Sequence, residues 1–156
     1  MVVGFAARST TRFGLMTSAS AAPPPRALPS TGTGYRPGTC NIGPEEIARR
    51  RRAGHIGLIA TVVVLAVLLA IHIPPVFRLV LFLPAAGAAI GYLQAWFRFC
   101  AGFGARGIYN FGPLGRTSSV DDPASAAQDR AMARRLALGS AIVGAVVAVV
   151  AVLLPA

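Results

Sequence analysis

Long apolar runs alternate with short charged stretches along this chain. Three runs of 19 residues, at 55–73, 79–97 and 136–154, contain no Asp, Glu, Lys or Arg. A helix of that length rises about 28 Å, which is close to the roughly 30 Å thickness of the hydrocarbon core of a bilayer. The pattern therefore predicts three transmembrane helices.

The residues between the runs predict how these helices begin and connect. Two consecutive prolines, Pro74 and Pro75, cannot continue a helix, so the first two runs are expected to form an antiparallel hairpin. Pro44, followed by two glutamates in the same turn, predicts a helix that leads into the first run. Asp122 followed by Pro123 is a favourable helix start and predicts a helix that continues into the third run.

We expect an all-α membrane protein, with a transmembrane helical hairpin, a third transmembrane helix and a disordered N-terminal tail. The expected parts are a basic tail at 1–39, a hairpin membrane domain at 40–116 and, at 117–156, a cytoplasmic helix continuing into the third span. The tail contains no acidic residue and cannot bury a core. Its Arg- and Ser-rich composition is also typical of a cleaved organelle transit peptide, and a true start at Met16 is a further alternative. No secretory signal is evident, because arginines interrupt the first apolar stretch.

Composition and charge predict the orientation. Only 13% of the residues are charged, against about 25% in soluble domains. The net charge is +10, all 15 basic residues are arginines, and the expected topology places every arginine except Arg78 on one side of the membrane. The positive-inside rule then puts the N-terminus in the cytoplasm and the C-terminus outside, with Arg78 reaching the outer headgroups. We expect a cell inner membrane, or an organelle membrane in a eukaryotic host, and no nucleic-acid partner.

The candidate chemistry is limited to two thiols and a histidine. Cys40, Cys100 and His55 all fall on the predicted cytoplasmic side. One hypothesis is that these three residues form a metal site, and another is that the two cysteines form a redox pair. Neither hypothesis is supported by a Cys-x-x-Cys or His-x-x-His spacing, because none is present. The alternative is that both cysteines are isolated small residues. We expect no cofactor.

Small residues recur at helical spacing in the second and third runs. Such stripes let transmembrane helices approach closely. The predicted packing residues are Gly87, Gly91, Ala95, Ser140, Gly144 and Ala148. They favour packing onto a second copy or a larger membrane complex within the lipid bilayer.

These patterns favour a non-enzymatic scaffold or accessory subunit. The sequence has no P-loop, serine-hydrolase or zinc-protease motif, and we expect no catalytic residue. A thiol or metal site at Cys40 and Cys100 is one alternative function. A small oligomeric transporter or pore is the other, disfavoured because no charge lies within the apolar runs.

Short motifs on either side of the hairpin resemble a known family. Asn41-Ile42-Gly43, Glu46, Arg49 or Arg50, and Gly54 precede the first run, and Phe99-Cys100 follows the second. This order resembles the YgaP-like two-helix transmembrane domain, over about residues 40–112. Ala101 stands where that family has proline, and the third run and the tail have no counterpart in it. The resemblance implies a helical hairpin, dimerisation through the membrane helices and no established catalysis.

Overall fold

The computed structural model describes residues 34–155. In chain order its elements are α1 (Pro44–Ala70), the 3₁₀ helix η1 (Pro75–Leu81), α2 (Phe82–Trp96), α3 (Ala101–Arg106), β1 (Ile108–Tyr109), β2 (Ser118–Ser119) and α4 (Pro123–Leu153). Among these residues three helical segments are long and apolar enough to cross a membrane, namely α1, η1 with α2, and α4. This confirms the prediction of three long apolar helices.

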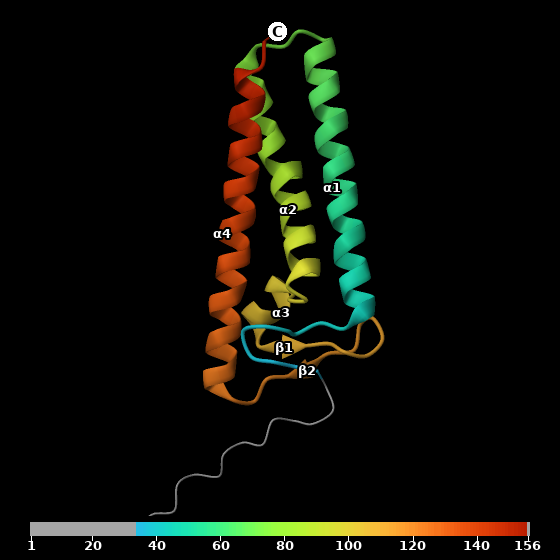
Figure 1. Cartoon of the computed structure of the whole chain (residues 1–156), viewed down its shortest axis with the longest axis vertical. Coiled ribbons are helices and arrows are strands. Elements are labelled where there is room, and N and C mark those ends of the chain that lie inside the picture. The colour runs from blue at the N-terminus through green and yellow to red at the C-terminus, as the bar shows by residue number, and fades with distance from the viewer. Residues whose placement is uncertain (1–33, 156) are drawn as a thin grey trace, which may run out of the picture.

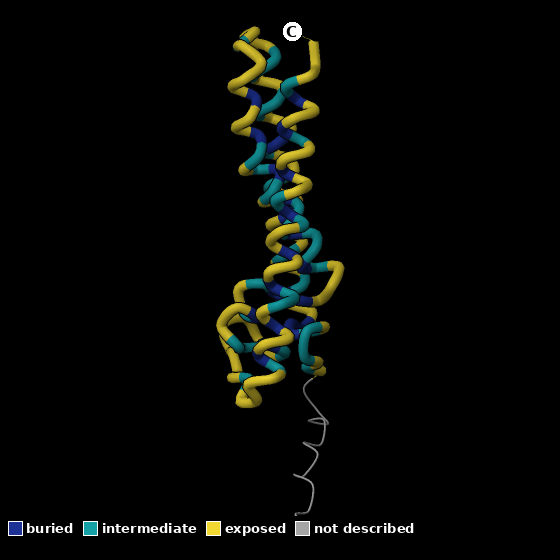
Figure 2. Tube along the Cα trace, turned by 90° about the vertical axis from the view of Figure 1, so that its left-hand side faces the viewer, coloured by how far each residue is buried: buried dark blue, intermediate teal, exposed yellow. Residues whose placement is uncertain are grey.

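The helices stand side by side, with α2 in the middle. α2 packs against both α1 and α4. Figure 1 shows α1 and α4 running in the same direction and α2 running back between them. α1 and α4 pack on α2 rather than on each other, so the three helices form an open layer rather than a closed bundle. Figure 2 gives the view turned by 90°, in which the helices overlap over part of their length and separate toward the end that carries the C-terminus. The two broad faces of this layer are largely exposed.

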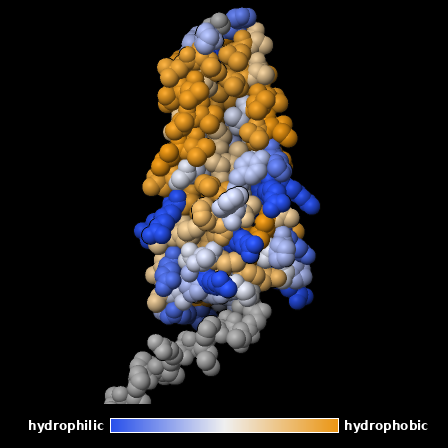
Figure 3. Space-filling view, in the orientation of Figure 1, coloured by the Kyte–Doolittle hydropathy of each residue, from blue (hydrophilic) through white to orange (hydrophobic). Residues whose placement is uncertain are grey.

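A polar cap closes one end of the layer. We define the cap as residues 34–43 and 97–122, which include α3 and the antiparallel pair β1–β2. Figure 3 shows hydrophobic residues covering the helices and hydrophilic residues gathered at the cap. The described chain is mostly helical, as predicted, and the short antiparallel pair of strands is an addition that the prediction did not contain. Residues 34–39 belong to the ordered cap, which corrects the predicted tail boundary, and the remainder of that prediction lies outside the described residues.

Glycines set the separation between α1 and α2. A Cβ atom added to Gly91 would lie 2.5 Å from the backbone nitrogen of Gly54 and 2.7 Å from its Cα. A Cβ atom on Gly57 would lie 2.6 Å from the backbone nitrogen of Ala88. Backbone atoms cannot move aside as a flexible side chain does, so these positions require glycine. The first apolar run thus has its own small-residue face.

Four of the six predicted packing residues, Gly91, Ser140, Gly144 and Ala148, are buried within the described chain, whereas Ala95 is half-buried and Gly87 is exposed. Ser140, Gly144 and Ala148 are buried along α4, and a Cβ on Gly144 would lie 2.8 Å from Cβ of Ala86 in α2. Gly87, in contrast, is exposed, and an added Cβ would meet nothing within 4 Å. The prediction that Gly87 shares a packing face with Gly91 is therefore wrong for contacts within residues 34–155.

Arg78 is buried between η1 and the end of α4. Its side chain is 0% exposed, and its Nη1 donates to the carbonyl oxygens of Ala151 (3.1 Å) and Leu154 (2.8 Å) at the end of α4. The expectation that Arg78 reaches the headgroups is wrong, because the guanidinium satisfies carbonyls that the helix end leaves free. Arg78 also lies inside the second candidate span, which the sequence pattern placed after it.

Candidate functional site

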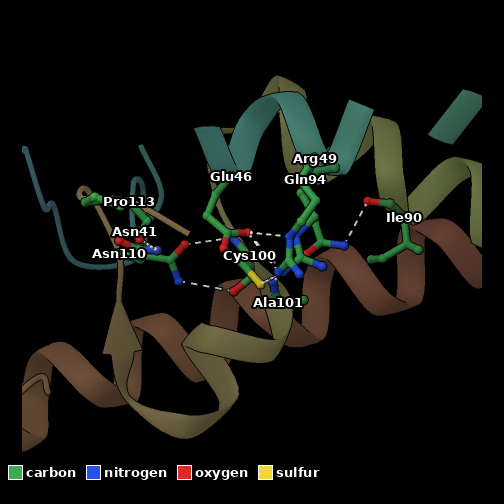
Figure 4. Close-up of polar contacts among 10 residues, drawn as sticks. Asn41, Glu46, Arg49, Ile90, Gln94, Cys100, Ala101, Asn110 and Pro113 are labelled. Atoms are coloured by element: carbon green, nitrogen blue, oxygen red, sulfur yellow. Dashed lines mark hydrogen bonds and ion pairs between the residues drawn. The ribbon is translucent and has the colours of Figure 1, made fainter. Parts of the chain in front are cut away.

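The centre of the cap is a hydrogen-bonded clamp between the chain before α1 and the chain after α2. The side chain of Asn41 accepts from the backbone nitrogen of Cys100 (2.6 Å) and donates to its carbonyl oxygen (3.1 Å). The backbone of Asn41 bonds to Arg98 and Asn110. Figure 4 shows Asn41 and Cys100 side by side beneath the first turns of α1. Through its side chain and its backbone, the fully buried Asn41 thus joins three segments that are distant in sequence.

The end of α2 is closed by a second amide. Arg98 has a left-handed backbone (φ 52°), and the amide of Phe99 bonds back to the carbonyl of Gln94 at 3.0 Å. This is the geometry of a helix C-terminus that usually takes glycine at the left-handed position. The Gln94 side chain donates to Ile90 and accepts from the backbone of Ala101, so it links α2 to the first residue of α3 (Figure 4).

A buried carboxylate lies beside the clamp. Glu46 is 2% exposed, and its Oε2 lies 2.9 Å from Nη2 of Arg49 and 3.6 Å from Nη2 of Arg50. Arg50 also donates to the Sγ of Cys100 at 3.0 Å and lies over the ring of Phe103. Glu46 therefore does more than begin the helix, because it neutralises an arginine that contacts the clamp.

A second buried acid fixes the start of the cap onto α4. Asp129 is 0% exposed and accepts from the hydroxyl of Tyr35 (2.9 Å) and the backbone nitrogen of Gly38 (2.6 Å). The Tyr35 ring stacks on Tyr109. Burial, together with the adjacent Asp129 carboxylate, raises the pKa of Tyr35. Tyr35 therefore remains a neutral hydrogen-bond donor at physiological pH.

The three predicted ligands do not form a metal site. His55 bonds to the hydroxyl of Tyr92 (2.7 Å), Cys40 contacts the carbonyl of Ile42, and Cys100 is held by Arg50. Across residues 34–155 no group of three or more His, Cys, Asp or Glu side chains could hold a metal ion. The metal prediction is therefore wrong for the described part of the chain. Both cysteines are free thiols.

Sequence reasoning missed a large open hollow beside the clamp. It has a volume of about 1000 Å³ and lies between the chain before α1, the first turns of α1 and the end of α2. Its charged lining residues are Arg36, Arg51 and Arg98, and its aromatic ones include Trp96 and Phe97. The run Trp96-Phe97-Arg98 is the signal that could have indicated it, since an aromatic and a basic residue follow directly on an apolar helix.

The chain was compared with protein-family models, curated proteins and solved structures. None of the three comparisons finds a match. The resemblance to the YgaP-like domain therefore stays a prediction, carried by the sequence motifs alone.

Proposed function

We propose that this protein is a non-enzymatic, multi-pass membrane protein that serves as a scaffold or accessory subunit. The proposal rests on one observation, which is that buried polar side chains bond to other parts of the chain. Asn41, Gln94 and Asp129 are each occupied by backbone groups of another segment, and Glu46 by two arginines. Such groups hold loops together, whereas a catalytic acid, base or nucleophile needs access to a substrate.

The exposed apolar surface supports a membrane location. Large apolar side chains are exposed on all three spans, among them Ile56 at 68%, Leu83 at 69% and Leu138 at 64%. A continuous apolar surface of this kind is stable in lipid and would cause aggregation in water. Eleven of the twelve arginines between residues 34 and 155 lie in the cap or in the cap-side turns of α1 and α4. The positive-inside rule then places the cap in the cytoplasm.

Reporter fusions test this orientation. Alkaline phosphatase fused after residue 156 should be active and green fluorescent protein at the same place dark, because the C-terminus lies at the end opposite the cap. The reverse result would contradict the proposed orientation.

The proposed contact with a partner lies on the exposed face of α2. Gly87 is open there, with Leu83 and Val80 exposed one and two turns earlier. A second copy or a larger membrane complex would approach at this glycine.

The test is crosslinking and pull-down in mild detergent. Gly87→Leu should reduce association, and Ala145→Leu, at an exposed position of α4, is the matched control. Unchanged association in both variants would reject this face. Gly91→Leu is unsuitable, because it would disturb the contact with α1.

A thiol function is the second candidate, favoured by the 3.0 Å contact between Arg50 and Cys100. Cys100 is 1% exposed, so this function requires the cap to open. Reversible Cys40–Cys100 disulfide formation under mild oxidation, detected by mass spectrometry, would support it. Full retention of both thiols would reject it.

A further inference from the structure

The hollow beside the clamp brings together three arginines from separate segments. Arg36 precedes α1, Arg51 lies in the second turn of α1, and Arg98 follows α2. All three are exposed, and within the described residues no side-chain hydrogen bond or ion pair occupies their guanidinium groups. Their positive charge is therefore available to a ligand.

No carboxylate competes for these arginines. Among the residues that line the hollow there is no Asp or Glu. The sequence of residues 1–33 contains no acidic residue either. The lining of the hollow therefore supplies no counter-ion for this charge.

The backbone conformation of Arg98 is a second, independent indication of a binding site at this hollow. Its left-handed backbone (φ 52°) is the position in a helix C-terminus that glycine fills without strain. A side chain held there carries a conformational cost, and such strain is typically found at functional sites. An arginine at this position contributes a cationic side chain to the lining of the hollow, which glycine could not do.

An apolar hollow adjoins the basic one. The two share Arg51, Ala95 and Trp96, and the second is otherwise lined by Tyr92 and Leu93 of α2. Trp96 is 83% exposed and lies at the end of α2, where the apolar surface gives way to the cap. Exposed tryptophan at such a boundary is typical of the membrane interface. A ligand that fills both hollows has an anionic head and an apolar tail.

We propose that the two hollows together bind one anionic phospholipid of the surrounding membrane. Its phosphate lies between Arg36, Arg51 and Arg98, and an acyl chain lies along Tyr92 and Leu93. Guanidinium groups bind phosphate oxygens in a bidentate manner, and basic pockets between helix ends on the cytoplasmic side bind anionic headgroups. The inference rests on the proposed insertion of the helices into a membrane, and not on the scaffold role.

Lipid retention tests the proposal. The full chain is purified from nanodiscs of phosphatidylglycerol and phosphatidylcholine, and native mass spectrometry measures the lipid that remains bound. We expect phosphatidylglycerol to be retained selectively, and Arg98→Gly to weaken retention about five- to tenfold. This variant suits the backbone, so circular dichroism should show an intact fold. Arg135→Gln, at an exposed position of α4, is the control with the same loss of charge and should retain the lipid.

Trp96 reports on the source of the phosphate, because it is the only tryptophan in the chain. Its emission should shift when phosphatidylglycerol is added to zwitterionic micelles, and should not respond to glycerol 3-phosphate or inorganic phosphate. A saturable response to the soluble phosphates alone would overturn the lipid assignment. Equal retention by the wild type and Arg98→Gly, or equal loss in the Arg98 and Arg135 variants, would also overturn the proposal. Association that is unchanged in Gly87→Leu, with lipid binding intact, would count only against the proposed function.

Discussion

The two ends of the helical layer each hold an arginine side chain, but with different partners. At the capped end Arg50 has a carboxylate, a thiol and an aromatic ring beside it. At the other end Arg78 has only the carbonyl oxygens of α4, and its Nε and Nη2 have no partner among the described residues. The capped end thus uses an arginine within a network, whereas the far end uses one to close a helix. Irregular backbone is gathered at the capped end, and so is the basic hollow.

The largest expected effect follows from breaking the clamp. Asn41→Ala leaves the buried backbone nitrogen and carbonyl of Cys100 without partners, at about 1–3 kcal/mol for each group. We expect a loss of about 2–4 kcal/mol in the free energy of unfolding in micelles, and faster hydrogen exchange at the Cys100 amide. Exchange at the far end should not change.

Thr39→Ala is the control for this variant. Thr39 is exposed and bonds only within its own loop, at 3.4 Å. A Cys100 amide that stays equally protected in Asn41→Ala would show that the clamp does not hold the cap.

The next largest effect is a difference in stability between alanine substitutions at the two glycines of α2. Gly91→Ala places a Cβ against the backbone of Gly54 and should cost about 1–3 kcal/mol of stability. Gly87→Ala meets nothing and should leave stability unchanged or slightly higher, since alanine favours the helix. Thermal unfolding of the two variants measures the difference, and equal losses would contradict the close contact between α1 and α2.

The far end should respond more weakly. Arg78→Met removes two hydrogen bonds to the end of α4, but it also removes a buried charge that has no counter-ion. These effects oppose one another, so we expect the free energy of unfolding to fall by only about 1 kcal/mol. Hydrogen exchange should become faster in the last turn of α4 and nowhere else. Arg78→Lys keeps the cation and should retain part of the protection. Destabilisation that extends to the cap would show that the two ends are coupled.

The same contrast explains how far the sequence could predict the structure. The helices of the layer follow from local signals, and Pro44 and Asp122 begin α1 and α4 as expected. The positions of Arg78 and of the Asn41 clamp depend on residues 73 and 59 positions away along the chain. Apolar periodicity contains no information about such contacts. The metal prediction failed for this reason, because a shared membrane face does not decide which side chains meet.

The smallest effect concerns the start of α4, on the capped side. The carboxylate of Asp122 accepts from the hydroxyl and the backbone nitrogen of Ser125 and from the backbone nitrogen of Ala124, and these bonds lower its pKa. An acid whose pKa is lowered by folding stabilises the fold above its unfolded pKa, and this contribution is lost as the pH falls through the lowered value. The Ser125 amide resonance should therefore titrate below the ordinary aspartate pKa of 3.8. Asp122→Asn keeps a helix cap and should abolish the titration, whereas Asp121→Asn should leave it in place. A titration that persists in Asp122→Asn would assign the pH dependence to another group of the cap.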